Sequence, residues 1–185
     1  MGIALTILSY DHGFIQQVID VLGEAAKRRI ADGQKTGILE IAEFLERFMD
    51  RFHHGKEEKF LFPVVARSSP SLMPGIQELI SDHQRSRDLL KAMVSEMREG
   101  GSAGKLYELS RMLAEHMTAH IAKEEEIIFP EIGKDLTPED DQRINREFNN
   151  FTVGLFYKFF EEAANRIQND ILGPGFYESR PDRSS

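Results

Sequence analysis

The chain has 185 residues, a formal net charge of −8 and no cysteine. This length suits one domain with a sizeable core, or one domain with an appendage. The acidic balance argues against nucleic acid and against an anionic membrane surface as partners. The lack of cysteine excludes disulfides, thiolate metal sites and cysteine nucleophiles, and no basic region precedes the short apolar run at the start. We therefore expect a soluble, cytoplasmic protein.

A first helix is predicted over about residues 3 to 30. Apolar residues recur there at steps of three or four from Leu5 to Leu22, which marks one buried face. His12 lies within this face. Residues 31 to 37 follow as a loop, because glycine and polar residues dominate them.

A second helix is predicted from about residue 37 into the mid-sixties. His53 and Glu57 lie on its apolar stripe, whereas His54 and Glu58 continue a row of polar residues. The α-helical period therefore predicts that His53 and Glu57 face the core. It predicts that His54 and Glu58 face its edge or water.

Two further helices are predicted, over about residues 75 to 98 and 105 to 132. Each follows a break rich in proline, serine or glycine. His83 lies on the apolar face of the first of these helices, and His120 and Glu124 lie on the apolar face of the second.

The predicted fold is all-α, with an up-down-up-down four-helix bundle over residues 1 to 135. Long helical patterns separated by short breaks favour antiparallel neighbours, and that arrangement brings the four histidines to a common height within about one turn. An additional C-terminal helix is predicted within residues 136 to 172. Its phenylalanine-rich face must be buried against the bundle or in a dimer. Residues 173 to 185 are expected to form a flexible tail.

The second and fourth helices carry two copies of one motif. HHGKEEKFLFP occupies residues 53 to 63, and HIAKEEEIIFP occupies residues 120 to 130. Residues four apart share one face of a helix, so each copy aims a histidine nitrogen and a carboxylate at one point. Helical bundles build metal sites in this way. The upstream pairs Asp11-His12 and Asp82-His83 complete the pattern, their aspartates being interpreted as surface acids.

The residue types favour a metal over an internal hydrogen-bond network. Burying four imidazoles and two carboxylates without a cation leaves charges and polar atoms uncompensated, at a cost on the order of several kcal/mol. Nitrogen and oxygen ligands without thiolate suit iron or manganese and tolerate zinc. Two acids able to bridge favour a pair of ions over a single ion.

The doubled motif resembles the hemerythrin family in its bacterial and archaeal cation-binding form, over roughly residues 3 to 133. Members of that family are four-helix bundles with a non-haem di-iron centre, so the resemblance implies two iron ions bridged by carboxylates. The implied terminal ligands are His12, His53, His83 and His120, and the implied bridges are Glu57 and Glu124.

The sequence departs from the oxygen-carrying hemerythrins at one position. Those proteins have a further histidine one turn after the ligand of the third helix, whereas residue 87 here is arginine. One iron is therefore expected to have an open position or a substitute ligand. His116, one turn before His120, is either that ligand or a neighbour that orients the ligands. Glu125 is a less central alternative to Glu124.

Three functions fit this ligand set. The favoured one is a di-iron protein that binds or senses dioxygen or a related small oxidant, such as nitric oxide or peroxide. The second is an enzyme that reduces peroxide or nitric oxide, or aids iron repair, with Arg87 and His116 near the open position. The third is a metal-responsive module whose aromatic C-terminal helix meets a protein partner. We expect a monomer or homodimer, and a ligand gap at Arg87 predicts autoxidation too fast for an oxygen carrier.

Overall fold

The computed structural model describes residues 2–28, 35–151 and 156–174, and within them every regular element is a helix, so the chain is all-α as predicted. None of the described helices is long and apolar enough to cross a membrane. The α-helices are α1 (Ile3–Arg28), α2 (Lys35–Phe44), α3 (Phe62–Ser68), α4 (Met73–Arg98), α5 (Ala103–Lys123), α6 (Phe129–Asp135), α7 (Pro138–Phe151) and α8 (Phe156–Leu172).

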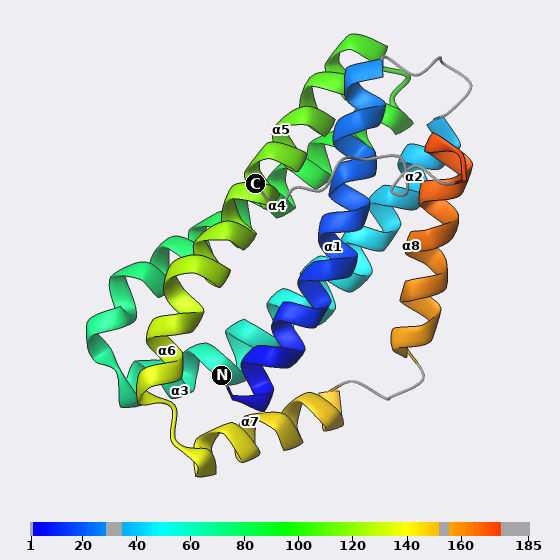
Figure 1. Cartoon of the computed structure of the whole chain (residues 1–185). Coiled ribbons are helices and arrows are strands. Elements are labelled where there is room, and N and C mark those ends of the chain that lie inside the picture. Colours follow the sequence, from blue (N-terminus) through cyan, green and yellow to red (C-terminus); the bar gives the residue numbers. More distant parts are fainter. Residues whose placement is uncertain (1, 29–34, 152–155, 175–185) are drawn as a thin grey trace, which may run out of the picture.

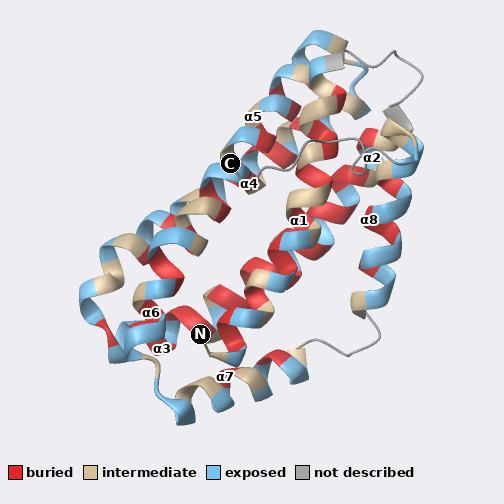
Figure 2. Cartoon of the chain, viewed as in Figure 1, coloured by how far each residue is buried: buried red, intermediate tan, exposed pale blue. Residues whose placement is uncertain are grey.

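Four long helical runs lie side by side in Figure 1: α1, the run from α2 to α3, α4, and the run from α5 to α6. Helix α5 contacts both α1 and α4. Figure 2 shows buried positions recurring along these helices, as expected for helices that each turn one apolar face inward.

The interior contains two hydrophobic clusters, and polar residues separate them. One cluster includes Ile15, Phe48 and Leu113, and the other includes Leu8, Leu61 and Phe129. The candidate ligands lie between the two clusters along each of the four runs, so both ends of the site are closed by apolar side chains.

Three stretches of the second and fourth runs are π-helical: η2 (Leu45–His54), η3 (Glu57–Leu61) and η5 (Glu124–Ile128). The amides of Phe62 and Phe129 donate to the carbonyl oxygens of Glu57 and Glu124, five residues earlier. Both of these stretches end at a Phe-Pro pair. Proline has no amide proton and its ring crowds the carbonyl four residues earlier, so a wider turn relieves that contact. π-helical turns are rare and frequently occur at functional sites.

The prediction of one C-terminal helix is wrong, because α7 and α8 are separate helices that flank residues 152–155, which lie outside the described residues. Helix α7 crosses the end of the bundle near the N-terminus (Figure 1). There the Asp141 carboxylate accepts hydrogen bonds from the amides of Ile3 and Ala4, at 2.8 and 2.9 Å, and caps α1.

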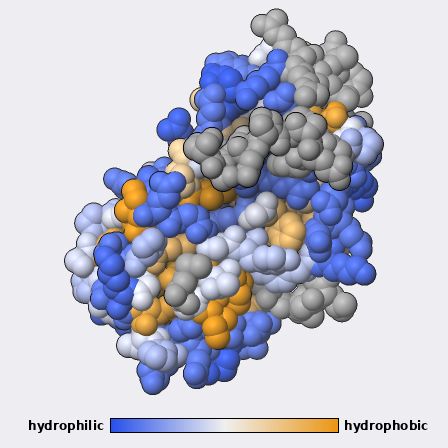
Figure 3. All heavy atoms as spheres, in the orientation of Figure 1, coloured by the Kyte–Doolittle hydropathy of each residue, from blue (hydrophilic) through white to orange (hydrophobic). Residues whose placement is uncertain are grey.

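Helix α8 packs against α1 and α2. Its Phe160 is buried between Phe44 and Phe48, while Phe159 is 55% exposed. On the face of the molecule that Figure 3 shows, apolar residues form separate patches within a largely hydrophilic surface. Most of the predicted flexible tail, residues 175 to 185, lies outside the described residues.

Candidate metal centre

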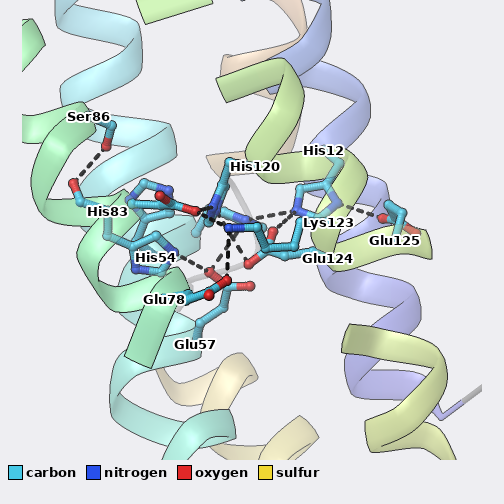
Figure 4. Close-up of polar contacts among 12 residues, drawn as sticks. His12, His54, Glu57, Glu78, His83, Ser86, His120, Lys123, Glu124 and Glu125 are labelled. Carbon is cyan, nitrogen blue, oxygen red and sulfur yellow. Dashed lines mark hydrogen bonds and ion pairs between the residues drawn. The ribbon is translucent and has the colours of Figure 1, made fainter. Parts of the chain in front are cut away.

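Seven side chains from the four helical runs meet in two adjacent groups. The three-histidine group consists of His54, His83 and His120, and the histidine–carboxylate group consists of His12, His53, Glu57 and Glu124. Within each group, one possible ligand atom per residue lies within 4.8 Å of the others. All seven residues are buried. Figure 4 shows His54, His83, His120, His12 and the two carboxylates turned toward a common centre.

The two carboxylates join the groups. Oε1 of Glu124 lies 3.4 Å from Nε2 of His120, while its Oε2 lies 3.1 Å from Nε2 of His12. Oε2 of Glu57 lies 3.4 Å from Nε2 of His83 and 3.7 Å from Nε2 of His53. Each acid therefore faces histidines of both groups, which is the arrangement needed to bridge two cations.

Many atoms at this centre have no hydrogen-bond partner among the described residues. They include both ring nitrogens of His54 and His120, Nε2 of His83, and all four carboxylate oxygens of Glu57 and Glu124. A buried polar atom without a partner costs about 1–3 kcal/mol. Cations between the two groups would satisfy the carboxylate oxygens and the Nε2 atoms of these histidines, and the donor set of nitrogen and oxygen fits iron, manganese or zinc. The residues present therefore fit a pair of metal ions.

In all five histidines of the two groups, Nδ1 is the outer ring nitrogen, turned away from the centre, and it faces an acid. Nδ1 of His12 lies 2.6 Å from Glu125, and Nδ1 of His83 lies 2.8 Å from Glu58. The corresponding distances are 3.3 Å from His53 to Asp11, 3.6 Å from His54 to Asp50 and 3.7 Å from His120 to Asp82. Histidines that bind metals through Nε2 usually present Nδ1 to a carboxylate, which orients the ring and its tautomer.

These contacts repeat between the two copies of the sequence motif. His53, Lys56, Glu57, Glu58 and Phe62 of the first copy correspond to His120, Lys123, Glu124, Glu125 and Phe129 of the second. In both copies the lysine binds the aspartate that precedes its own copy, and the phenylalanine stacks on the histidine that precedes the other copy. The internal repeat is therefore an approximate twofold symmetry of the site.

The buried groups compete for protons. Burial opposes a charge on His12, but contacts with Glu124 and Glu125 outweigh it and raise the pKa of His12 to about 10. Neighbouring carboxylates likewise outweigh burial at His83 and raise its pKa to about 9. Burial and the charge of Glu57 raise the pKa of Glu124 to about 8. At neutral pH, protons therefore occupy three groups that a metal would require in their deprotonated forms.

The prediction that His54 faces the edge or water is wrong, because His54 is fully buried and its ring stacks on His83 at a centroid distance of 3.8 Å. The physical reason is the π-helical winding of η2. In η2 the amide of Gly55 donates to the carbonyl of Asp50, five residues earlier. A turn with more residues places neighbouring side chains closer in angle, so His53 and His54 both reach the centre. The two consecutive histidines, His53 and His54, were the sequence feature that could have indicated two inward-facing rings.

His54 joins His83 and His120 from a different helix, so it could serve as the substitute ligand expected because residue 87 is arginine. The Arg87 guanidinium instead binds Asp50 at 2.6 Å and Glu58 at 2.7 Å, so it neutralises two of the outer acids. The expectation of fast autoxidation stays a prediction.

His116 lies outside both groups and donates from Nε2 to the carbonyl oxygen of Asp82, 2.9 Å away. Glu125, the alternative to Glu124, contacts the outer nitrogen of His12 and the Ser9 hydroxyl. Both residues therefore approach the ligands from outside.

The interpretation of Asp11 as a surface acid is wrong, because Asp11 is fully buried between His53 and Lys56. Asp82 is partly buried and binds Lys123 at 2.8 Å. The sequence feature that could have indicated these contacts is the lysine at the same place in both motif copies, Lys56 and Lys123. Each lysine provides the preceding aspartate with a cation.

In the comparison with known families, residues 4–132 match the hemerythrin HHE cation-binding domain. No curated protein and no solved structure matched the chain. The matched region contains all seven residues of the two groups and ends before α7.

Proposed function

Because the chain belongs to the hemerythrin HHE cation-binding domain family, we propose that its two groups hold two iron ions and that the protein binds or senses dioxygen or a related small oxidant. The match confirms the family resemblance of the doubled motif. The observation that carries the proposal is Glu124, whose two oxygens face histidines of different groups. Manganese and zinc suit the same donors, and the family's iron chemistry favours iron.

The two groups offer unequal numbers of ligands. Besides the shared carboxylates, the three-histidine group supplies three nitrogens and the histidine–carboxylate group supplies two, from His12 and His53. An ion held by His12 and His53 would therefore have more room for an external ligand. Bound ferrous iron supplies the capacity to bind and reduce small oxidants.

The protein's own residues orient the ligands and exclude water from them. The outer acids fix the histidine rings, and the phenylalanines of the two Phe-Pro pairs stack on two ligands. Phe129 lies 5.6 Å from His12 and Phe62 lies 6.0 Å from His83, between ring centroids. Apolar walls of this kind limit the access of water to the centre.

Binding or sensing is favoured over turnover by the positions of Arg87 and His116. The enzyme hypothesis needs a charge and a proton donor at the open position, whereas these two side chains contact outer acids and a backbone carbonyl. The proposal includes an up-down-up-down arrangement of the four runs, with residues 136–172 as an addition. It also includes a cytoplasmic location, no nucleic-acid or membrane partner, and a monomer or homodimer.

The test is metal analysis after anaerobic loading with ferrous iron, together with the optical spectrum before and after exposure to air. We expect two iron ions per chain and a new visible absorption after air. His53→Ala should lower the iron content, while the matched control His116→Ala should retain it, because His116 lies outside both groups. A chain that takes up no iron would refute the proposal.

A further inference from the structure

The approximate symmetry of the two motif copies breaks at Lys56. Lys123 is about one-third exposed, and it binds Asp82 and Glu78 at the surface. Its counterpart Lys56 is fully buried and binds Asp11. The second polar partner of Lys56 is the hydroxyl of Tyr157, at 2.7 Å.

Aromatic rings surround the Lys56 ammonium. It lies 4.4 Å from the ring centroid of Phe52, 5.2 Å from that of Tyr157 and 5.5 Å from that of Phe148. These rings come from η2, α8 and α7. A buried ammonium requires acceptors for its protons, so the loss of the Tyr157 hydroxyl would leave part of this charge unsatisfied.

A chain of contacts therefore runs from α8 to a candidate ligand. The Tyr157 hydroxyl meets Lys56, Lys56 donates to Oδ2 of Asp11, and the same oxygen lies 3.3 Å from Nδ1 of His53. Nε2 of His53 faces the histidine–carboxylate group. Tyr157 lies outside residues 4–132, so this contact is additional to the matched family domain.

We propose that Lys56 and Tyr157 are positioning residues that couple α8 to the histidine–carboxylate group, so that metal binding there and docking of α8 stabilise each other. The inference rests on the proposed metal binding. Metal binding through Nε2 of His53 would keep the ring proton on Nδ1, from where it would be donated to Asp11. Asp11, oriented by this contact, accepts a hydrogen bond from Lys56, and Lys56 in turn donates to the Tyr157 hydroxyl.

The coupling is reciprocal, because any free energy by which metal favours docked α8 must equally favour metal binding when α8 is docked. Metal binding thereby changes how stably α8 is docked on α1 and α2, at the outside of the bundle. Allosteric couplings between sites are commonly about 5-fold to 150-fold, and a chain of three contacts should lie near the lower limit.

The experiment is amide hydrogen exchange on the full chain, with and without ferrous iron under anaerobic conditions, with α5 amides as an internal reference. In the unmodified protein, iron should slow exchange in α8 about fivefold more than it slows exchange in α5. Tyr157→Phe should abolish this additional slowing and weaken iron binding about fivefold, with two ions still bound at saturation. Lys56→Met interrupts the chain at another link and should have the same effect.

The matched control is Tyr10→Phe. The Tyr10 ring lies 6.0 Å from the Tyr157 ring, is largely exposed and is not part of the chain of contacts. It should behave as the unmodified protein. If the unmodified protein bound two ions without additional slowing of exchange in α8, the coupling would be overturned and the proposed function would stand. The same conclusion would follow if Tyr10→Phe and Tyr157→Phe lost the additional slowing and the affinity for iron equally. Absence of iron uptake by the unmodified protein would overturn both.

Discussion

Replacing His54 with leucine should stabilise the metal-free protein and weaken the metal-loaded one. Both ring nitrogens of His54 are buried without a hydrogen-bond partner among the described residues. Burial, together with the positive charge of neighbouring histidines, holds the pKa of His54 well below its usual value, so the ring is neutral. Leucine has no polar atoms that require partners.

The magnitude for the metal-free protein follows from opposing contributions. Removing two unsatisfied polar atoms should stabilise it by about 1–3 kcal/mol per atom. Loss of the ring stacking on His83 costs about 0.5–1.5 kcal/mol, and imperfect packing of leucine costs up to about 1.5 kcal/mol. The middle values of these ranges, about 4 kcal/mol gained and about 2 kcal/mol lost, give a net gain of about 2 kcal/mol. Each kcal/mol raises Tm by about 2–4 °C in a chain of this size.

In the presence of iron the sign reverses. An ion at a free concentration of about 100 times its Kd stabilises the fold by about 2.7 kcal/mol. His54→Leu removes one of three nitrogens from the three-histidine group, so the stabilisation by the ion held there should be lost. Replacing residues that merely orient metal ligands costs about 10-fold to 100-fold in affinity, and loss of a ligand should cost at least as much.

The assay is thermal unfolding with and without ferrous iron, together with iron stoichiometry. Ile121→Leu is the matched control, because Ile121 occupies the equivalent position in the second motif copy and is buried. His54→Leu should have a higher metal-free Tm and a smaller increase with iron. The reasoning would be refuted by a His54→Leu protein that still binds two ions with the full increase in Tm.

Three further predictions concern protons, carboxylates and the C-terminal helices. Loading both groups at pH 7 should release about three protons, because His12, His83 and Glu124 have pKa values of about 10, 9 and 8. The affinity for metal should therefore fall as pH falls below 7. Titration calorimetry in buffers of different ionisation enthalpy measures the number of protons released, and metal binding without proton release would contradict this prediction. Glu124→Gln should reduce binding of both ions, whereas Glu125→Gln should weaken binding about 10-fold through His12 while two ions still bind at saturation. Equal effects in metal titrations would rule out a bridging role for Glu124. Deleting residues 137–185 should expose the apolar surface under Phe160 and cause aggregation, and light scattering from a folded, monodisperse monomer would contradict this.

The sequence alone determined the family, the all-α class and six of the seven grouped residues. The doubled His-x-x-x-Glu motif places histidine and glutamate on one helical face whatever the details of packing, because residues four apart share a face. The order of helices and breaks then indicates which helices are neighbours. These predictions depend on local spacing, and the structure brings the six residues together.

The tertiary structure decided the features that depend on winding and on contacts distant in sequence. His54 reaches the centre because η2 is π-helical, which an α-helical period does not predict. Asp11 is buried because Lys56, 45 residues later, neutralises it. Tyr157 lies near both through the packing of α8 on α1. Hydrophobic periodicity reports which face of a helix is buried, whereas the partner of a buried charge is determined only when the helices pack together.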